Sequence, residues 1–225
     1  MKKSFTAGSI PRQLATFSFP ILLANLLQAS MQLINSLWVG NLLGSAAFGA
    51  VTVGTTVIIV VLAFVLGINN ATLTIFAQLK GSNDQKRINS YLSAFVIILA
   101  VLSLIISVTG YVLTEPLLAL MNTPASIASE AKAYLQISFI GTFLLVGYNF
   151  IGTALRAFGD SKTPLYFVLL ATVLATVLDP LFIAGFDLGV AGAAYATVLA
   201  QSIAFIYSLF YLSGRFKNTA SDSSF

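Results

Sequence analysis

One carboxyl group in the sequence lies inside an apolar stretch long enough to cross a bilayer. Asp179 is preceded by Ala-Thr-Val-Leu and followed by Pro-Leu-Phe-Ile, and neither flank carries a cation. Charge inside a membrane is costly, so an ionisable residue there is by default a candidate functional residue. Because burial disfavours the charged form, such a carboxyl is suited to take up and release a proton or to hold a small cation such as Na⁺.

Pro180 follows this carboxyl directly. Proline cannot donate a backbone hydrogen bond and clashes with the preceding turn, so it frees carbonyl groups near Asp179 and bends the helix. Interrupted helices at membrane depth are where transporters place ion sites. The alternative is that Asp179 reaches the membrane interface and that Leu-Asp-Pro forms only a kink with a local cap. Pro20 presents the same choice in the first apolar segment, where a plain kink is the favoured interpretation.

Amide side chains recur in the first apolar segment at intervals of three or four residues: Asn25, Gln28, Gln32 and Asn35. This spacing places them on one face of a helix. The polar face is predicted either to hold helices together by hydrogen bonds or to line a watery cavity. Weaker single polar candidates follow in later segments, at Asn149, Thr197 and Gln201.

Other chemistry is poorly supported. The sequence has no Cys and no His, which removes disulfides, thiolate nucleophiles and the usual general base. Its carboxylates are too dispersed to predict a paired acid and base, and the nearest approximation to a phosphate-binding loop, at 159–163, has the wrong spacing. Basic residues are scattered and form no patch of the kind that binds nucleic acid. We therefore predict a protein that is not an enzyme, takes no cofactor beyond a coupling H⁺ or Na⁺, and binds no nucleic acid.

The elements that carry these residues are apolar spans. The chain is 58% hydrophobic and only 8% charged, and its mean hydropathy is +0.95. A helix needs roughly 20 residues to cross a bilayer, so there is room for about six crossings. The apolar segments lie near 14–39, 48–79, 91–113, 133–155, 164–184 and 190–212. The predicted fold is an all-α integral membrane lobe of six transmembrane helices over 14–212, between a cytoplasmic segment at 1–13 and a cytoplasmic polar tail at 213–225.

Basic residues predict the orientation of these spans. Ten of the eleven precede, join or follow the spans on one side: Lys2, Lys3, Arg12, Lys80, Lys86, Arg87, Arg156, Lys162, Arg215 and Lys217. Lys132 alone falls on the other side. An excess of Lys and Arg marks the cytoplasmic side, so both termini are expected in the cytoplasm of a protein of the plasma or inner membrane. The first apolar run is too long for the core of a signal peptide and is expected to be retained.

Two stretches carry a family resemblance. The first is FPILLANLLQ at 19–28, continuing as INSLWVG at 34–40. The second is GTALRAFGDSKTP at 152–164, followed by VLDPLFI at 177–183 and GVAGAA at 189–194. They resemble the N-terminal half of the multidrug and toxic compound extrusion (MATE) family, and together they run through nearly the whole chain. The resemblance implies two six-helix lobes around a central cavity that export small organic cations or amphipathic compounds in exchange for H⁺ or Na⁺.

The resemblance also implies roles for single residues. Asp179 matches the acidic residue of the family's fifth helix that takes part in cation coupling, and Asn149 and Thr197 fall where members place its polar partners. Asn35 stands where many members have an Asp, and Ala175 stands where an Asn is often found. An amide ligates through its oxygen but does not exchange a proton in the physiological range. A coupling site with a single carboxyl is therefore expected.

The sequence covers only one of the family's two lobes. We expect it either to be half of a transporter that needs a second six-helix lobe, which is the favoured interpretation, or to assemble as a homodimer. An inactive fragment or non-transporting membrane assembly subunit is an alternative, although such a subunit would need no intramembrane carboxyl. A lipid-linked oligosaccharide flippase of the same superfamily is another. It would be expected to carry basic residues inside its spans to meet a pyrophosphate, and none is predicted there.

Overall fold

The computed structural model describes residues 9–82 and 85–221, with side chains for all of these except Gln85 and 214–221. The described chain consists of helices joined by short turns: α1 Ile10–Leu43, α2 Ser45–Gly81, α3 Gln85–Val112, α4 Thr114–Leu120, α5 Ala125–Ala157, α6 Lys162–Pro180, the π-helical turn η1 Leu181–Gly185, and α7 Gly189–Ser221. Within the described ranges, six helices are long and apolar enough to cross a membrane, with α6 and η1 acting as one span. This confirms the all-α, six-span fold class.

The helices run beyond the predicted apolar segments because backbone hydrogen bonding continues into the polar flanks. The connection expected between the apolar segments 14–39 and 48–79 shrinks to Gly44, which separates α1 from α2. Its φ of +91° is a backbone conformation that a residue with a Cβ rarely adopts. The short helix α4 was not anticipated, because its segment was expected to be part of a connection.

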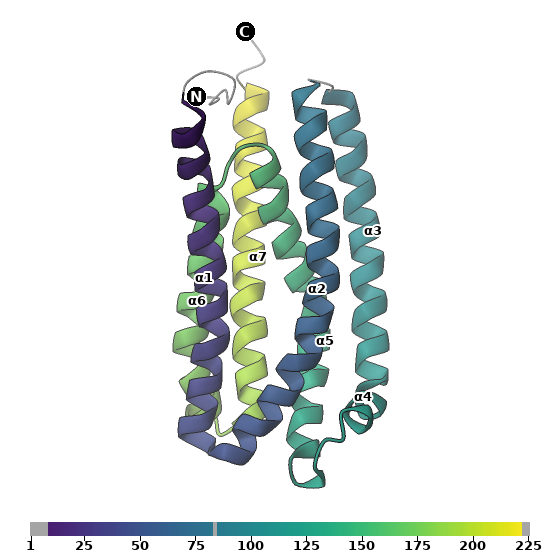
Figure 1. The fold of residues 1–225 in the computed structure, drawn as a ribbon, viewed down its shortest axis with the longest axis vertical. Helices are drawn as coiled ribbons and strands as arrows, with labels where there is room; N and C mark the ends of the chain where they lie inside the picture. Colours follow the sequence, from purple (N-terminus) through teal and green to yellow (C-terminus); the bar gives the residue numbers. More distant parts are fainter. Residues whose placement is uncertain (1–8, 83–84, 222–225) are drawn as a thin grey trace.

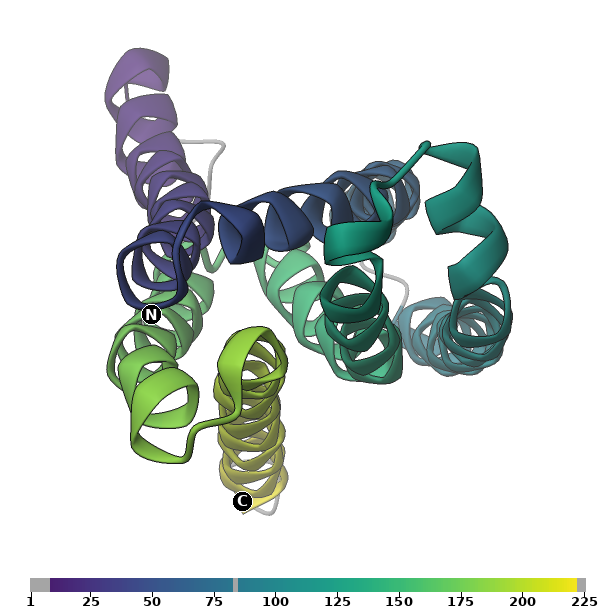
Figure 2. The same ribbon diagram turned by 90° about the horizontal axis from the view of Figure 1, so that it is seen from below.

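Helix α5 is the axis of the bundle. It packs against α2, α3 and α7, while α6 packs against α1 and α7. Seen along the helices, α1 and α6 stand at one side and α3 at the other, with α5 between them and α2 crossing obliquely from the end of α1 toward α3 (Figures 1 and 2). Most of the membrane-length segment of α5 is buried, whereas α1 and α3 are mostly exposed. Contact with lipid or with another protein is therefore left chiefly to the outer helices.

All of the cations whose side chains are described, except Lys132, gather at one end of the bundle. The ends of α1, α2, α3, α5 and α6 there carry Arg12, Lys80, Lys86, Arg87, Arg156 and Lys162. The ammonium group of Lys80 also donates to the carbonyl of Phe158, which ties α2 to the end of α5. The predictions for Lys2, Lys3, Arg215 and Lys217 fall outside the described side chains.

At the other end, an exposed ion pair joins Lys132 of α5 to Glu115 of α4. The hydrogen bond and the charge of Lys132 hold the pKa of Glu115 below its ordinary range. Exposed pairs of this kind contribute little to stability, so the pair mainly fixes where α4 lies against α5.

The two prolines have different effects. Helix α1 continues on both sides of Pro20, which is buried. After Pro180 the helix widens into the π-helical turn η1, where the amide of Phe186 donates to the carbonyl of Leu181 at 2.9 Å. Single π-turns inside helices occur frequently at functional sites. Helix α7 reaches this turn closely because Gly192 has no side chain: a Cβ there would lie 2.6 Å from the carbonyl oxygen of Phe182.

Replacing Gly192 with Ala should therefore destabilise the protein, because η1 or α7 must shift to admit the Cβ. We expect the free energy of unfolding to fall by about 1–3 kcal/mol. The midpoint of thermal unfolding, followed by circular dichroism of the purified protein, measures the change. Gly67→Ala is the control, since nothing lies within 4 Å of a Cβ there and Ala favours a helix. Equal midpoints for the two variants would contradict the close packing of α7 on η1.

Candidate functional site

Asp179 lies in the last turn of α6 and is completely buried, at 0% exposure. Its Oδ1 accepts a hydrogen bond of 3.1 Å from Nδ2 of Asn35 on α1. The same amide group lies 3.4 Å from the hydroxyl of Thr197 and 3.4 Å from the carbonyl of Ala193, both on α7. Three helices thus meet at one carboxyl group. We call Asn35, Asp179 and Thr197 the carboxyl cluster.

Two oxygens of this cluster have no hydrogen-bond partner. Oδ2 of Asp179 and Oδ1 of Asn35 are among the buried side-chain atoms left unpaired in the described part of the chain. Leaving a buried polar atom unpaired costs about 1–3 kcal/mol. A proton on the carboxyl, or a small hard cation held by carboxylate and amide oxygens, would satisfy them. Among the described residues no group of three or more His, Cys, Asp and Glu side chains gathers.

Apolar layers enclose the carboxyl cluster on both sides. Toward one end lies a buried core that includes Val39, Tyr134 and Ile183. Toward the other end, Met31 of α1, Ala175 of α6 and Ala200 of α7 form a second buried group. Tyr134 of α5 was not singled out from the sequence, because nothing in its local sequence distinguishes it from the other tyrosines.

A second polar site lies nearer the cation-rich end. Arg156, expected in a connection between spans, belongs to the last turn of α5. Its Nη2 lies 3.5 Å from the place where a Cβ on Gly152 would be, so the guanidinium folds back along α5. It lines a cavity of about 10 Å³ together with Asn25, Gln28, Tyr148 and Asn149, among others. The helix continues through the position where the apolar run ends, so Arg156 lies within α5 and beside a cavity instead of in a connection between spans.

The predicted polar residues divide between these two sites. Asn149 does not join the carboxyl cluster; its amide donates to the carbonyl of Leu145 at 2.8 Å, and its side chain lines the Arg156 cavity. On the polar face of α1, Asn35 bonds to another helix, whereas Asn25 and Gln28 line a cavity. The two predicted roles of this face, holding helices together and lining a cavity, are thus taken by different residues. Gln32 is half-buried and lines neither of the two cavities found between these helices.

The loop before α6 fixes the start of that helix through hydrogen bonds. The Asp160 carboxylate accepts hydrogen bonds from the backbone amide of Thr163 at 3.0 Å and from its hydroxyl at 2.8 Å. The hydroxyl of Thr163 also lies 3.3 Å from that of Tyr211 on α7. These contacts fix where α6 starts and hence how far along it Asp179 lies.

Comparisons with known proteins extend this description. A family model described as MatE matches residues 20–181. A relative named "Probable multidrug resistance protein YpnP", from Bacillus subtilis (strain 168), is 56% identical over 208 residues, which cover 92% of this chain and 47% of the relative. The crystal structure of the Vibrio cholerae MATE transporter VcmN in the bent form matches with a TM-score of 0.85 at 25% identity, over 91% of this chain and 46% of that one. The chain thus spans about half the length of the curated relatives it matches.

Replacing Asn35 with Leu removes the donor to Asp179 and leaves both carboxylate oxygens unpaired. We expect a loss of about 1–3 kcal/mol in the free energy of unfolding. Combining it with Asp179→Leu should recover most of that loss, since replacing both partners by apolar groups is close to neutral.

Thermal unfolding of the purified variants measures both effects. Asn41→Leu serves as a matched control on the same helix, at an exposed position that lines neither cavity. A double variant no more stable than Asn35→Leu alone would show that the hydrogen bond is not the source of the loss.

Proposed function

Since this chain belongs to the MATE family of multidrug efflux transporters, we propose that it is one lobe of a secondary active antiporter that exports cationic or amphipathic compounds in exchange for H⁺ or Na⁺. The observation that carries the proposal is the buried carboxyl of Asp179, which lies between three helices with one oxygen unpaired. A fixed structural contact would gain from satisfying that oxygen. A site that must bind and release an ion gains from leaving it open.

Ion exchange at Asp179 would couple to helix packing. With an ion bound, the carboxyl cluster is close to neutral, and α1 rests against α6 and α7 through the Asn35 amide. Without the ion, an uncompensated charge is buried between the same helices, which disfavours this packing. A ligand that binds one arrangement better than another shifts the population toward it. The coupling ion would therefore bias where α1 lies, and α1 is the outer helix whose surface is mostly exposed.

The exposed surface supports a membrane setting and a second lobe. Large apolar side chains on α1 are more than half exposed, among them Phe19, Leu22 and Leu26. Such a surface is stable only against lipid or another apolar surface. Since the matched relatives are about twice as long, we propose that a second six-helix lobe, or a second copy of this chain, completes the transporter. The cation-rich end of the bundle would face the cytoplasm.

The remaining alternatives are less well supported. A non-transporting assembly subunit would have no use for a buried carboxyl with an open oxygen. The guanidinium of Arg156, which lines a cavity, is an observation that favours a flippase. The curated relatives, however, are named as multidrug resistance and export proteins. The family match and the names of the relatives support transport over an enzymatic reaction.

The decisive experiment replaces Asp179 with Asn and measures efflux of a fluorescent cationic dye from cells. The chain is expressed alone and together with the remaining half of the 56% identical relative. Efflux supported by the parent chain should fall to that of cells lacking it, because the amide cannot exchange an ion. Asp187→Asn makes the same chemical change at an exposed turn and should leave efflux unchanged.

Export by the chain alone would identify a homodimer, and export only with the second half would identify a lobe. Full export by Asp179→Asn would refute coupling at this carboxyl.

The proposed orientation can be tested in intact cells because the chain has no cysteine. Ser82→Cys places a thiol at the exposed end of α2, and Ser126→Cys places one in the exposed first turn of α5, at the opposite end of the bundle. A membrane-impermeant maleimide should label only Ser126→Cys from outside, with Ser82→Cys labelled after lysis. The reverse pattern would place the termini outside.

A further inference from the structure

Two small cavities lie in a row between α1, α5, α6 and α7. The first is the Arg156 cavity; the second, also about 10 Å³, is lined by Met31, Thr172 and Gln201, among others. The two share Gln28, Tyr148 and Val168 in their linings, so they adjoin each other. Each volume corresponds to about one water molecule.

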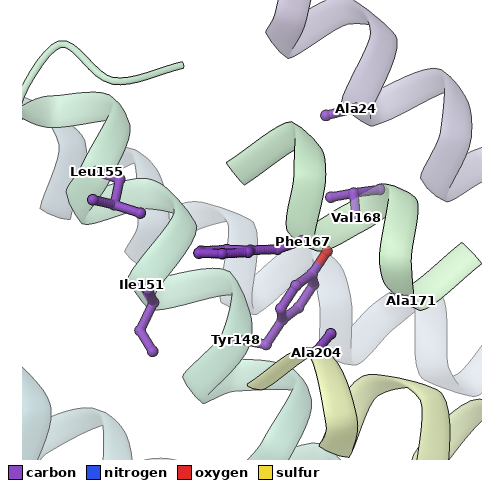
Figure 3. Close-up of a cluster of buried hydrophobic side chains, with 8 residues drawn as sticks. All are labelled: Ala24, Tyr148, Ile151, Leu155, Phe167, Val168, Ala171 and Ala204. Atoms are coloured by element: carbon purple, nitrogen blue, oxygen red, sulfur yellow. The ribbon is translucent and has the colours of Figure 1, made fainter. Parts of the chain in front are cut away.

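Both cavities offer what a buried water needs, which is two to four polar partners. The first presents the amides of Asn25 and Gln28 and the guanidinium of Arg156. The second presents the hydroxyl of Thr172 and the amide of Gln201. Tyr148 reaches across from α5, with its hydroxyl directed toward the part of α6 that carries Phe167 and Val168 (Figure 3). Polar side chains therefore line the row of cavities from the Arg156 end inward, beside apolar ones.

The polar row stops one layer short of the carboxyl cluster. On α1, Met31 follows Gln28 by three residues and precedes Asn35 by four. On α6, Ala175 stands in the same way between Thr172 and Asp179. Residues three or four apart share a helix face, so each of these residues lies between a cavity and the cluster.

Helix α7 completes this layer with Ala200, which lies between Gln201 and Thr197 along the chain. Met31, Ala175 and Ala200 are 5%, 1% and 0% exposed and pack in one group. Met31 is the only long side chain of the three, and it also lines the second cavity. A flexible, unbranched thioether flanked by two alanines needs only a rotamer change to move aside.

We propose that the two cavities form a hydrated vestibule entered from the Arg156 end, and that Met31 is the barrier separating its water from the Asp179 carboxyl. The inference rests on the proposed function, because the vestibule supplies the route by which an ion released from Asp179 leaves. Met31 closes the route while the carboxyl is occupied from the other side.

Hydration of the vestibule is testable on the unmodified chain by hydroxyl-radical footprinting, which oxidises side chains beside bound water. Tyr148 and Tyr134 are buried alike, at 5% and 6% exposure, but Tyr134 lines neither cavity. Tyr148 should be oxidised severalfold faster than Tyr134. Equal rates would overturn the hydrated vestibule.

The barrier is tested in sealed vesicles with Ag⁺, a thiol reagent small enough for a cavity the size of one water. Thr197→Cys places a thiol behind Met31, and Gln201→Cys places one in front, one turn away on the same helix. Ag⁺ added at the Arg156 end should react with Gln201→Cys severalfold faster than with Thr197→Cys. The unreacted thiol is then counted with maleimide after denaturation.

Adding Met31→Ala should raise the rate at Thr197→Cys severalfold, whereas Met31→Leu, which keeps the volume, should not. An unchanged rate in Met31→Ala, or a rate at Gln201→Cys no faster than at the buried Ala204→Cys, would overturn the barrier. Neither readout requires transport, so a failure of Asp179 coupling in the efflux experiment leaves these results interpretable.

Discussion

The structure depends on a carboxyl group buried where three helices of a membrane protein meet. Asp179 is wholly enclosed, and its one hydrogen bond to a side chain comes from the Asn35 amide on the outermost of those helices. Water cannot supply the missing partners in so enclosed a site. The charge on the carboxyl therefore changes how favourably α1 packs against α6 and α7. The other helices form a rigid frame around Asp179, and α1 is the least buried of the three helices that meet there.

The helix bundle is held rigid by the central helix α5 and by glycine positions at which neighbouring helices approach closely. Helix–helix contact in a membrane gains little from excluding lipid, so van der Waals packing decides it. Gly110 receives the ring of Phe139, which is buried at 2% exposure, and Gly192 lets α7 lie directly on the backbone of η1. The second contact bears on the proposed coupling site because η1 begins two residues after Asp179. The wide turn that Pro180 introduces is therefore held in place from outside instead of being free to straighten.

Polar and apolar layers alternate along the seam between α1, α5, α6 and α7. From the cation-rich end the order is the Arg156 cavity, the Gln28 and Gln201 cavity, the Met31 layer and the carboxyl cluster. Such an order keeps two polar regions close without joining them. The guanidinium of Arg156 and the carboxyl of Asp179 thus lie in the same seam, separated by an apolar layer.

The sequence by itself determined the class of the protein and its six spans, and it pointed to Asp179 as a carboxyl within an apolar run, because hydropathy and charge are local properties that a run of residues reveals. The spacing on α1 likewise identified a polar face, since helical periodicity is local. Which members of that face meet Asp179 was decided only by the tertiary structure. Asn35 reaches it and Asn149 does not, because contact depends on the depth at which helices distant in sequence cross. The inward turn of Arg156 and the barrier position of Met31 were likewise decided by the tertiary structure. Each depends on how neighbouring helices pack, which the pattern of residues within one segment does not reveal.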